Sequence, residues 1–178
     1  MVMTRIADGR FGSSDTAYLN IPIISLALGA TPPDAVLTTP YPGYSYDIND
    51  DSTFSVPIPA DWQSGTTISL YIRWGINEAF ALGSGTIQWN GLYMTVANDM
   101  TQVVGAGTTA NTSTGNINIP TLARQLRENL LVTIAAANLA VGDTIGLKVT
   151  RIAAGAAPVA DAEIYAAYLS YTRFISST

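Results

Sequence analysis

The chain has 178 residues, of which 48% are hydrophobic and only 12% are charged, and its formal net charge at pH 7 is −5. A length of this order is typical of one domain that buries about 70% of the surface of its unfolded chain. One lysine and seven arginines are scattered along the sequence, which argues against the clustered cations that nucleic-acid binding needs. The absence of cysteine and histidine excludes disulfides, cysteine-ligated zinc and a histidine base.

Residues 1–45 differ in composition from the rest and predict an extended N-terminal arm, with one strand near 21–28. Four prolines in the stretch TPPDAVLTTPYPGYSY remove backbone donors and favour extended conformation. The apolar run 21–30 is too short to span a membrane, so we expect no membrane contact. The arm has no room for its own core, so its apolar side chains need a surface to cover. The candidates for this contact are Ile21, Ile23, Leu26, Leu28, Tyr41 and Tyr44.

From about residue 50 onward the sequence predicts a series of strands, because apolar and polar residues alternate. Segments 52–59, 66–75, 85–97, 116–120, 130–139, 142–152 and 161–174 show this pattern. The alternation shifts phase near Gly91, which predicts a bulge, and segment 121–129 predicts a helical turn. The residues predicted to be buried between two sheets are Ile68, Leu70, Ile72, Trp74, Ile145, Leu147 and Val149.

About eight strands without alternating helices indicate an antiparallel sandwich or barrel. The chain length and the varied loop sizes favour a jelly roll over an immunoglobulin-type sandwich. The predicted fold is therefore all-β, an antiparallel β-sandwich of jelly-roll type. Residues 1–45 form its extended N-terminal arm and residues 46–178 form its jelly-roll domain.

Two features of the last strands predict contacts between segments or subunits. Segment 161–174 is apolar on both faces, so either the arm or a neighbouring subunit covers its outer side. Arg151 follows Leu147 and Val149 on the apolar face of its strand. It either pairs with Asp161 or Glu163 at the rim of the sandwich or contacts another subunit. The candidate subunit-interface residues are Arg151, Tyr165, Leu169 and Tyr171.

The sequence contains few patterns that support chemistry. Asp47, Asn49 and Asp51 match the start of a calcium loop, but the required glycine and final glutamate are missing, so a solvated turn is the preferred interpretation and no metal is predicted. No cofactor motif is present, and a serine or cysteine triad with histidine is impossible. We therefore expect a protein that is not an enzyme. Aromatic residues in loop-like segments are expected to be exposed and either bind carbohydrate or pack an arm onto the domain; the candidates are Trp62, Tyr41, Tyr44 and Tyr46.

Four segments carry a resemblance to a known family: VPIPADWQSGTTISLYIRW, IQWNGLYMTVA, GDTIGLKVTRIAA and DAEIYAAYLSYTRF. In the first segment a strand that ends in proline leads through a Gly-Thr turn into an apolar strand that ends in tryptophan. In the third segment a Gly-Asp turn opens a strand that ends in arginine, and the last segment is a strand rich in tyrosine. From Phe54 onward the sequence resembles the jelly-roll virion structural proteins of tailed bacteriophages, of the capsid-decoration (cement) or head-fibre type.

The resemblance implies a homotrimer that binds and stabilises the outer surface of a phage head. Its partners would be further copies of itself and the major capsid protein or other virion proteins, with no nucleic acid. Its location would be the capsid exterior, after assembly in the host cytoplasm. The arm would then be the anchor to the capsid, unless it only covers its own sandwich. The alternative function is a receptor- or glycan-binding module of a tail or head fibre.

Overall fold

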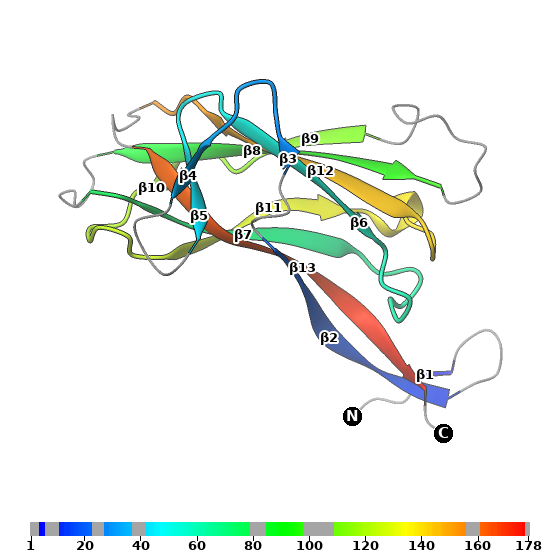
Figure 1. Cartoon of the computed structure of the whole chain (residues 1–178). Helices are drawn as coiled ribbons and strands as arrows, with labels where there is room; N and C mark the ends of the chain where they lie inside the picture. The colour runs from blue at the N-terminus through cyan, green and yellow to red at the C-terminus, as the bar shows by residue number, and fades with distance from the viewer. Residues whose placement is uncertain are drawn as a thin grey trace.

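The computed structural model describes residues 4–5, 11–22, 27–36, 42–78, 85–97, 109–155 and 161–176. These residues form two antiparallel sheets that pack face to face as a sandwich (Figure 1). The prediction of an all-β sandwich is confirmed. No helix in this part of the chain is long and apolar enough to cross a membrane.

One sheet has seven strands and is built around the last strand, β13 (Ala162–Ser176). On one edge of β13 lies β7 (Ile68–Ile76), followed by β11 (Arg127–Ile134). On the other edge β5 (Gly43–Tyr46) pairs with the start of β13 and β2 (Phe11–Ile21) pairs with the rest of it. The outermost strands of this edge are β4 (Asp34–Val36) and β1 (Thr4–Arg5).

The other sheet has six strands and is centred on β12 (Thr144–Ile152). Its neighbours are β6 (Asp51–Pro57) and β8 (Thr86–Val96). The short strand β3 (Ala27–Leu28) pairs with β6, and β9 (Thr109–Ser113) and β10 (Ile117–Asn118) pair with β8. A short 3-10 turn, η2 (Ala136–Asn138), connects the two sheets between β11 and β12.

The connections between these strands define a jelly roll. From β5 onward the chain alternates between the sheets, with one exception where β8 is followed by β9 and β10 in its own sheet. The resulting orders are β5–β13–β7–β11 in one sheet and β6–β12–β8–β9 in the other. Two interleaved four-stranded orders of this kind are the double Greek key of a jelly roll, so the predicted fold type is confirmed.

The core lies between the two sheets and contains all seven residues predicted from the alternation. Strand β7 contributes Ile68, Leu70, Ile72 and Trp74, and β12 contributes Ile145, Leu147 and Val149. The rings of Trp74 and Trp89 meet edge to face with centroids 6.1 Å apart, a geometry that adds to the free energy of burial alone. The period-two phase therefore identified the inner face of both central strands correctly.

Two local predictions were wrong. Segment 121–129 forms a turn and then the start of β11 at Arg127, not a helical turn. Strand β8 alternates without interruption from Thr86 to Val96 and keeps one register with β12, so there is no bulge at Gly91. Gly91 faces the core, where a Cβ atom would lie 2.7 Å from Cγ of Leu131 in the opposite sheet. The glycine allows the sheets to approach each other and leaves the strand regular.

Most of the described residues in the range 1–45 belong to strands of the two sheets. Strand β2 ends at Ile21 and β3 begins at Ala27, while residues 23–26 of the strand predicted over 21–28 lie outside the described residues. Beyond the last residue pair between β13 and β7, the end of β13 and the start of β2 form a two-stranded ribbon, defined here as residues 11–16 and 172–176, which projects from the sandwich (Figure 1). The loop before β7 braces its base, because Gln63 N donates to Thr172 O and Phe174 N donates to Asp61 O.

The contact at Gly91 generates a stability prediction. Gly91→Ala should destabilise the fold by about 1–3 kcal/mol, because the added methyl group overpacks the core against Leu131. Gly146→Ala is the matched control, since Gly146 lies on the outer face of β12 and its nearest neighbour would be 3.8 Å from the new Cβ. Urea unfolding of both variants measures the difference. Equal midpoints would show that the sheets do not meet closely at Gly91.

Candidate functional site

Arg151 lies inside the subunit, on the inner face of β12. Its side chain is only 1% exposed, its Nη1 donates to the carbonyl oxygen of Tyr46 at 2.7 Å, and the same nitrogen lies 3.8 Å from Oδ1 of Asp161. Burial lowers the pKa of Arg151, while the carboxylate of Asp161 raises it. Burial also raises the pKa of Asp161. The first of the two interpretations of Arg151, pairing with Asp161 at the rim, is confirmed.

A second buried charge lies beside it at the same end of the sandwich. Glu163 is buried and accepts two bonds from the guanidinium of Arg124, at 3.1 Å from Nε and 3.4 Å from Nη2. The hydroxyl of Tyr165 also donates to Glu163. Burial and this bond raise the pKa of Tyr165 to about 12. The two groups of contacts close this end of the sandwich.

The four residues predicted at a subunit interface are all buried within the single subunit. Leu169 packs in the core, and Tyr171 donates from its hydroxyl to Oδ1 of Asp61 at 3.0 Å. The burial of these four side chains is thus explained by contacts within the subunit and needs no neighbouring subunit. A direct role of Arg151, Tyr165, Leu169 and Tyr171 in subunit contacts stays a prediction.

The structure describes three of the six residues predicted for the arm. Ile21 is part of the core, Tyr44 packs against it, and Leu28 is exposed. Ile23, Leu26 and Tyr41 lie outside the described residues. The described members therefore contribute more to the subunit's own packing than to an exposed anchor.

The calcium-like pattern forms a turn. The backbone N–H of Asp47 donates to Oδ2 of Asp50 at 2.8 Å, and Asn49 has a positive φ of 76°. Asp51 points away from this turn and pairs with Lys148. Over the described residues no three acidic side chains come together as metal ligands.

A cluster of tyrosines on the outer face of the seven-stranded sheet was not identified from the sequence. Tyr71 and Tyr168 stack with ring centroids 5.2 Å apart, and Tyr18 meets Tyr168 edge to face at 5.7 Å. The guanidinium carbon of Arg73 lies 5.3 Å from the centroid of the Tyr168 ring, and Arg73 Nε pairs with Glu128 at 2.8 Å. Tyr18 is 64% exposed. Together with Leu130, which lies opposite Tyr71 and is 46% exposed, these residues form the tyrosine face.

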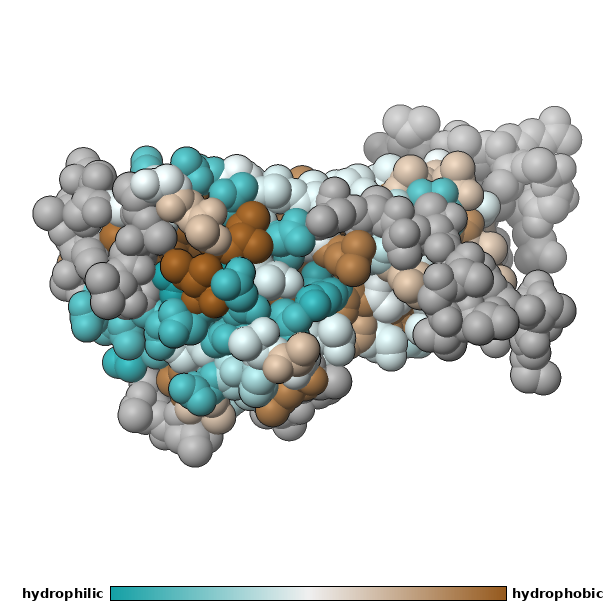
Figure 2. All heavy atoms as spheres, turned by 90° about the horizontal axis from the view of Figure 1, so that it is seen from above, coloured by the Kyte–Doolittle hydropathy of each residue, from teal (hydrophilic) through white to brown (hydrophobic). Residues whose placement is uncertain are grey.

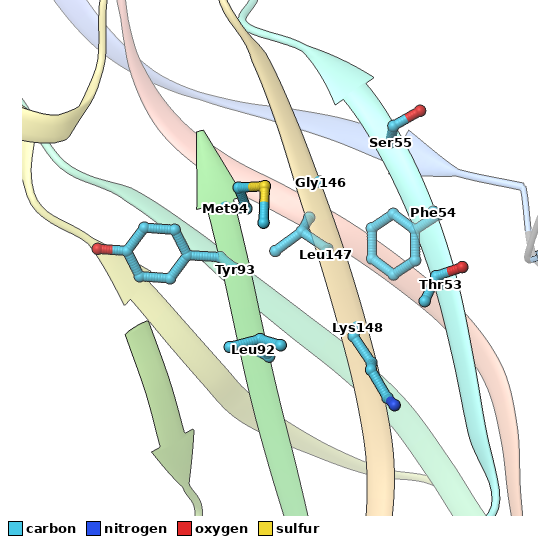
Figure 3. A pocket seen from close by; sticks show the side chains of 9 residues that line it. All are labelled: Thr53, Phe54, Ser55, Leu92, Tyr93, Met94, Gly146, Leu147 and Lys148. Carbon is cyan, nitrogen blue, oxygen red and sulfur yellow. The ribbon is translucent and has the colours of Figure 1, made fainter. Parts of the chain in front are cut away.

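A groove lies on the opposite side of the molecule, on the outer face of the six-stranded sheet. It has a volume of about 500 Å³ and runs across β6, β12 and β8 (Figure 3). Seen from this side, hydrophobic residues form separate patches among hydrophilic ones (Figure 2). The outward side chains around the groove belong to Thr53, Ser55, Leu92, Met94 and Lys148, with Gly146 between them.

No family model matches the sequence, and no curated protein matches it. Solved structures with a similar fold include the CBM36-1 domain of a multidomain xylanase from the hindgut metagenome of Trinervitermes trinervoides, at 13% identity and a TM-score of 0.48 over 87% of this chain and 96% of that domain. Another is the xylan-binding module CBM15, at 7% identity and a TM-score of 0.49 over 88% of this chain and 97% of that module. A third is the structure of infectious bursal disease virus, Gx strain, at 11% identity and a TM-score of 0.44 over 91% of this chain and 32% of that chain. Similarity at this level assigns neither a ligand nor a partner to this chain.

The buried position of Arg151 generates a second stability prediction. Arg151→Ala should cost about 3 kcal/mol or more, because it leaves a cavity and removes the donor to the buried Tyr46 carbonyl. Arg73→Ala is the control, since it removes an exposed ion pair that contributes about 1 kcal/mol or less. Chemical denaturation of the two variants measures the difference. If Arg151→Ala lowers the free energy of unfolding as little as Arg73→Ala does, Arg151 has no structural role.

Proposed function

We propose that the protein is a non-enzymatic structural subunit of a virion, a decoration protein that binds the outer surface of a phage head as a homotrimer. The observation that carries the proposal is the β2–β13 ribbon. A decoration protein needs a segment that reaches over neighbouring capsid subunits. The ribbon would suit this role, because it leaves the sandwich and is held in shape by the ladder between its two strands.

The reach of the ribbon follows from the pairing of β13. Its pairing with β7 ends where Tyr171 meets Ile68, and five further residues, 172–176, continue to pair with β2. At about 3.4 Å per residue, this extension is about 17 Å long. The loop residues 61–63 hold 172–174 on the other edge, so the last two residues, about 7 Å of strand, lie beyond this support. Ile175 is 40% exposed on this extension, so the ribbon offers an apolar side chain to a partner. The anchor proposed for residues 1–45 thus becomes a ribbon made from both ends of the chain.

The tyrosine face is the surface that best suits contact between subunits. Its ion pair, Arg73 with Glu128, is formed within the subunit. Buried charges are costly mainly when they have no partner, and covering this face would leave both of these charges paired. Tyrosines are also enriched at protein interfaces because they combine a large apolar ring with a polar hydroxyl. The low charged fraction of the chain, 12%, agrees with a protein whose surface is partly covered by other copies.

The competing function is a receptor- or glycan-binding module of a tail or head fibre. The groove on the six-stranded sheet is the observation that favours it. The two functions differ in which surface contacts the partner: the ribbon in a decoration protein, and the groove in a binding module.

The trimer proposal is tested by placing charges on the tyrosine face. The double variant Tyr18→Glu with Leu130→Glu should dissociate the oligomer to single chains, because a charge buried without a partner costs several kcal/mol. The control is Leu122→Glu with Val141→Glu, which changes two apolar residues of similar exposure, 64% and 59%, in loops. Sedimentation equilibrium gives the masses. A single-chain mass for the unaltered protein, or an unchanged oligomer in the first variant, would contradict the proposal.

The decoration role is tested at the ribbon. Ile175→Asp should weaken binding to undecorated capsids by about tenfold or more, as expected when an apolar anchor is lost from an interface, while Leu122→Asp should bind normally. Both side chains are exposed, so both variants should fold. Cosedimentation with capsids gives the affinities, and electron microscopy of virions gives the location. Equal affinities for the two variants would show that the ribbon is not the anchor.

A further inference from the structure

The groove owes its shape to Gly146. On β12 this residue lies between Met94 of β8 and Ser55 of β6, in the row of residues that crosses the outer face of the sheet. A Cβ atom built on Gly146 would have no neighbour closer than the Met94 carbonyl oxygen at 3.8 Å. The space above the glycine is therefore open. The volume of about 500 Å³ lies within the range typical of small-molecule sites.

The next row along the strands completes the lining. It consists of Leu92, Lys148 and Thr53, which lie side by side on β8, β12 and β6 (Figure 3). The β8 side of the groove is thus apolar, from Leu92 and Met94, and the β6 side carries the hydroxyl groups of Thr53 and Ser55. A ligand that fits must present a nonpolar surface on one side and hydrogen-bonding groups on the other.

Charge narrows the ligand class further. Lys148 is the only charged residue that lines the groove, and its ammonium group pairs with Asp51. Asp51 is 4% exposed and is held beneath Gly29, whose Cβ atom would collide with its carboxylate. The pair has no net charge, so it gives no electrostatic preference to an anion or a cation. The ammonium group has three donors, so it can still donate to a neutral oxygen beside the groove.

From this geometry we infer that the groove binds a short neutral oligosaccharide. A sugar ring has a nonpolar face of C–H groups, which suits Leu92 and Met94. Its hydroxyl groups suit Thr53, Ser55 and the ammonium group of Lys148. This inference rests on the groove that favours the glycan-binding alternative and names its ligand class. It is independent of the decoration role, because the groove lies on the opposite sheet from the tyrosine face and uses no residue of the ribbon.

Gly146→Val tests the site directly. The valine side chain should fill the groove, and the variant should fold because β-branched residues suit strands and the site has room for a Cβ atom. Thr150→Val is the control: it places a valine on the same face of β12, in a row that does not line the groove, and changes only a hydroxyl group to a methyl group. Both variants should keep the oligomer mass of the unaltered protein, which separates this test from that of assembly.

The probes are maltotriose, cellotriose, xylotriose, mannotriose and chitotriose, with trigalacturonic acid as a charged comparison, titrated into the full chain and followed by NMR. We expect at least one neutral trisaccharide to bind with millimolar or tighter affinity and to shift the amide signals of Ser55, Met94 and Gly146. Gly146→Val should lower that affinity at least tenfold, and Thr150→Val should leave it unchanged. The inference is overturned if no neutral probe binds, if trigalacturonic acid binds more tightly, or if the two variants behave alike.

Discussion

The pairing of β13 along both of its edges is the constraint on which the rest of the structure depends. Backbone N–H and C=O groups of a buried strand must find partners, and β13 finds them in β7 on one edge and in β5 and then β2 on the other. The last strand therefore joins the beginning, the middle and the end of the chain in one sheet. Because β13 is longer than β7, its final residues leave the sandwich with β2, and this excess length produces the ribbon.

A second constraint is the fit between the two sheets. Gly91 allows Leu131 to approach β8, and Trp74 and Trp89 fill the space toward the end where Arg151 is buried. Burying a guanidinium is costly unless it is hydrogen-bonded and paired. The Tyr46 carbonyl and Asp161 meet both requirements. The arginine on an apolar face is thus a structural residue, and the polar network around it closes one end of the core.

The sequence predicted the sandwich and its core well, because period-two alternation is a local signal that each strand carries by itself. It failed where the cause lay in another strand. Gly91 was interpreted as a break in the alternation. The need for a glycine at this position comes from its close contact with Leu131 in the opposite sheet, which the local pattern does not reveal. Glu128 was assigned to a helical turn from its local sequence. Its partner in the neighbouring strand, Arg73, is 55 residues away, so the local sequence does not reveal this pairing. The tyrosine face and the groove were missed for the same reason: each is assembled from adjacent strands that are distant in sequence.

The two outer faces of the sandwich have different physical characters, and this difference makes the proposed roles compatible. On the seven-stranded sheet, stacked rings and a satisfied ion pair give a surface that loses little when another protein covers it. On the six-stranded sheet, the missing side chain of Gly146 leaves a hollow between hydroxyl and apolar groups. Because the core separates these faces, subunits that associate through the tyrosine face would keep the groove open to solvent. Assembly and ligand binding can therefore be altered one at a time.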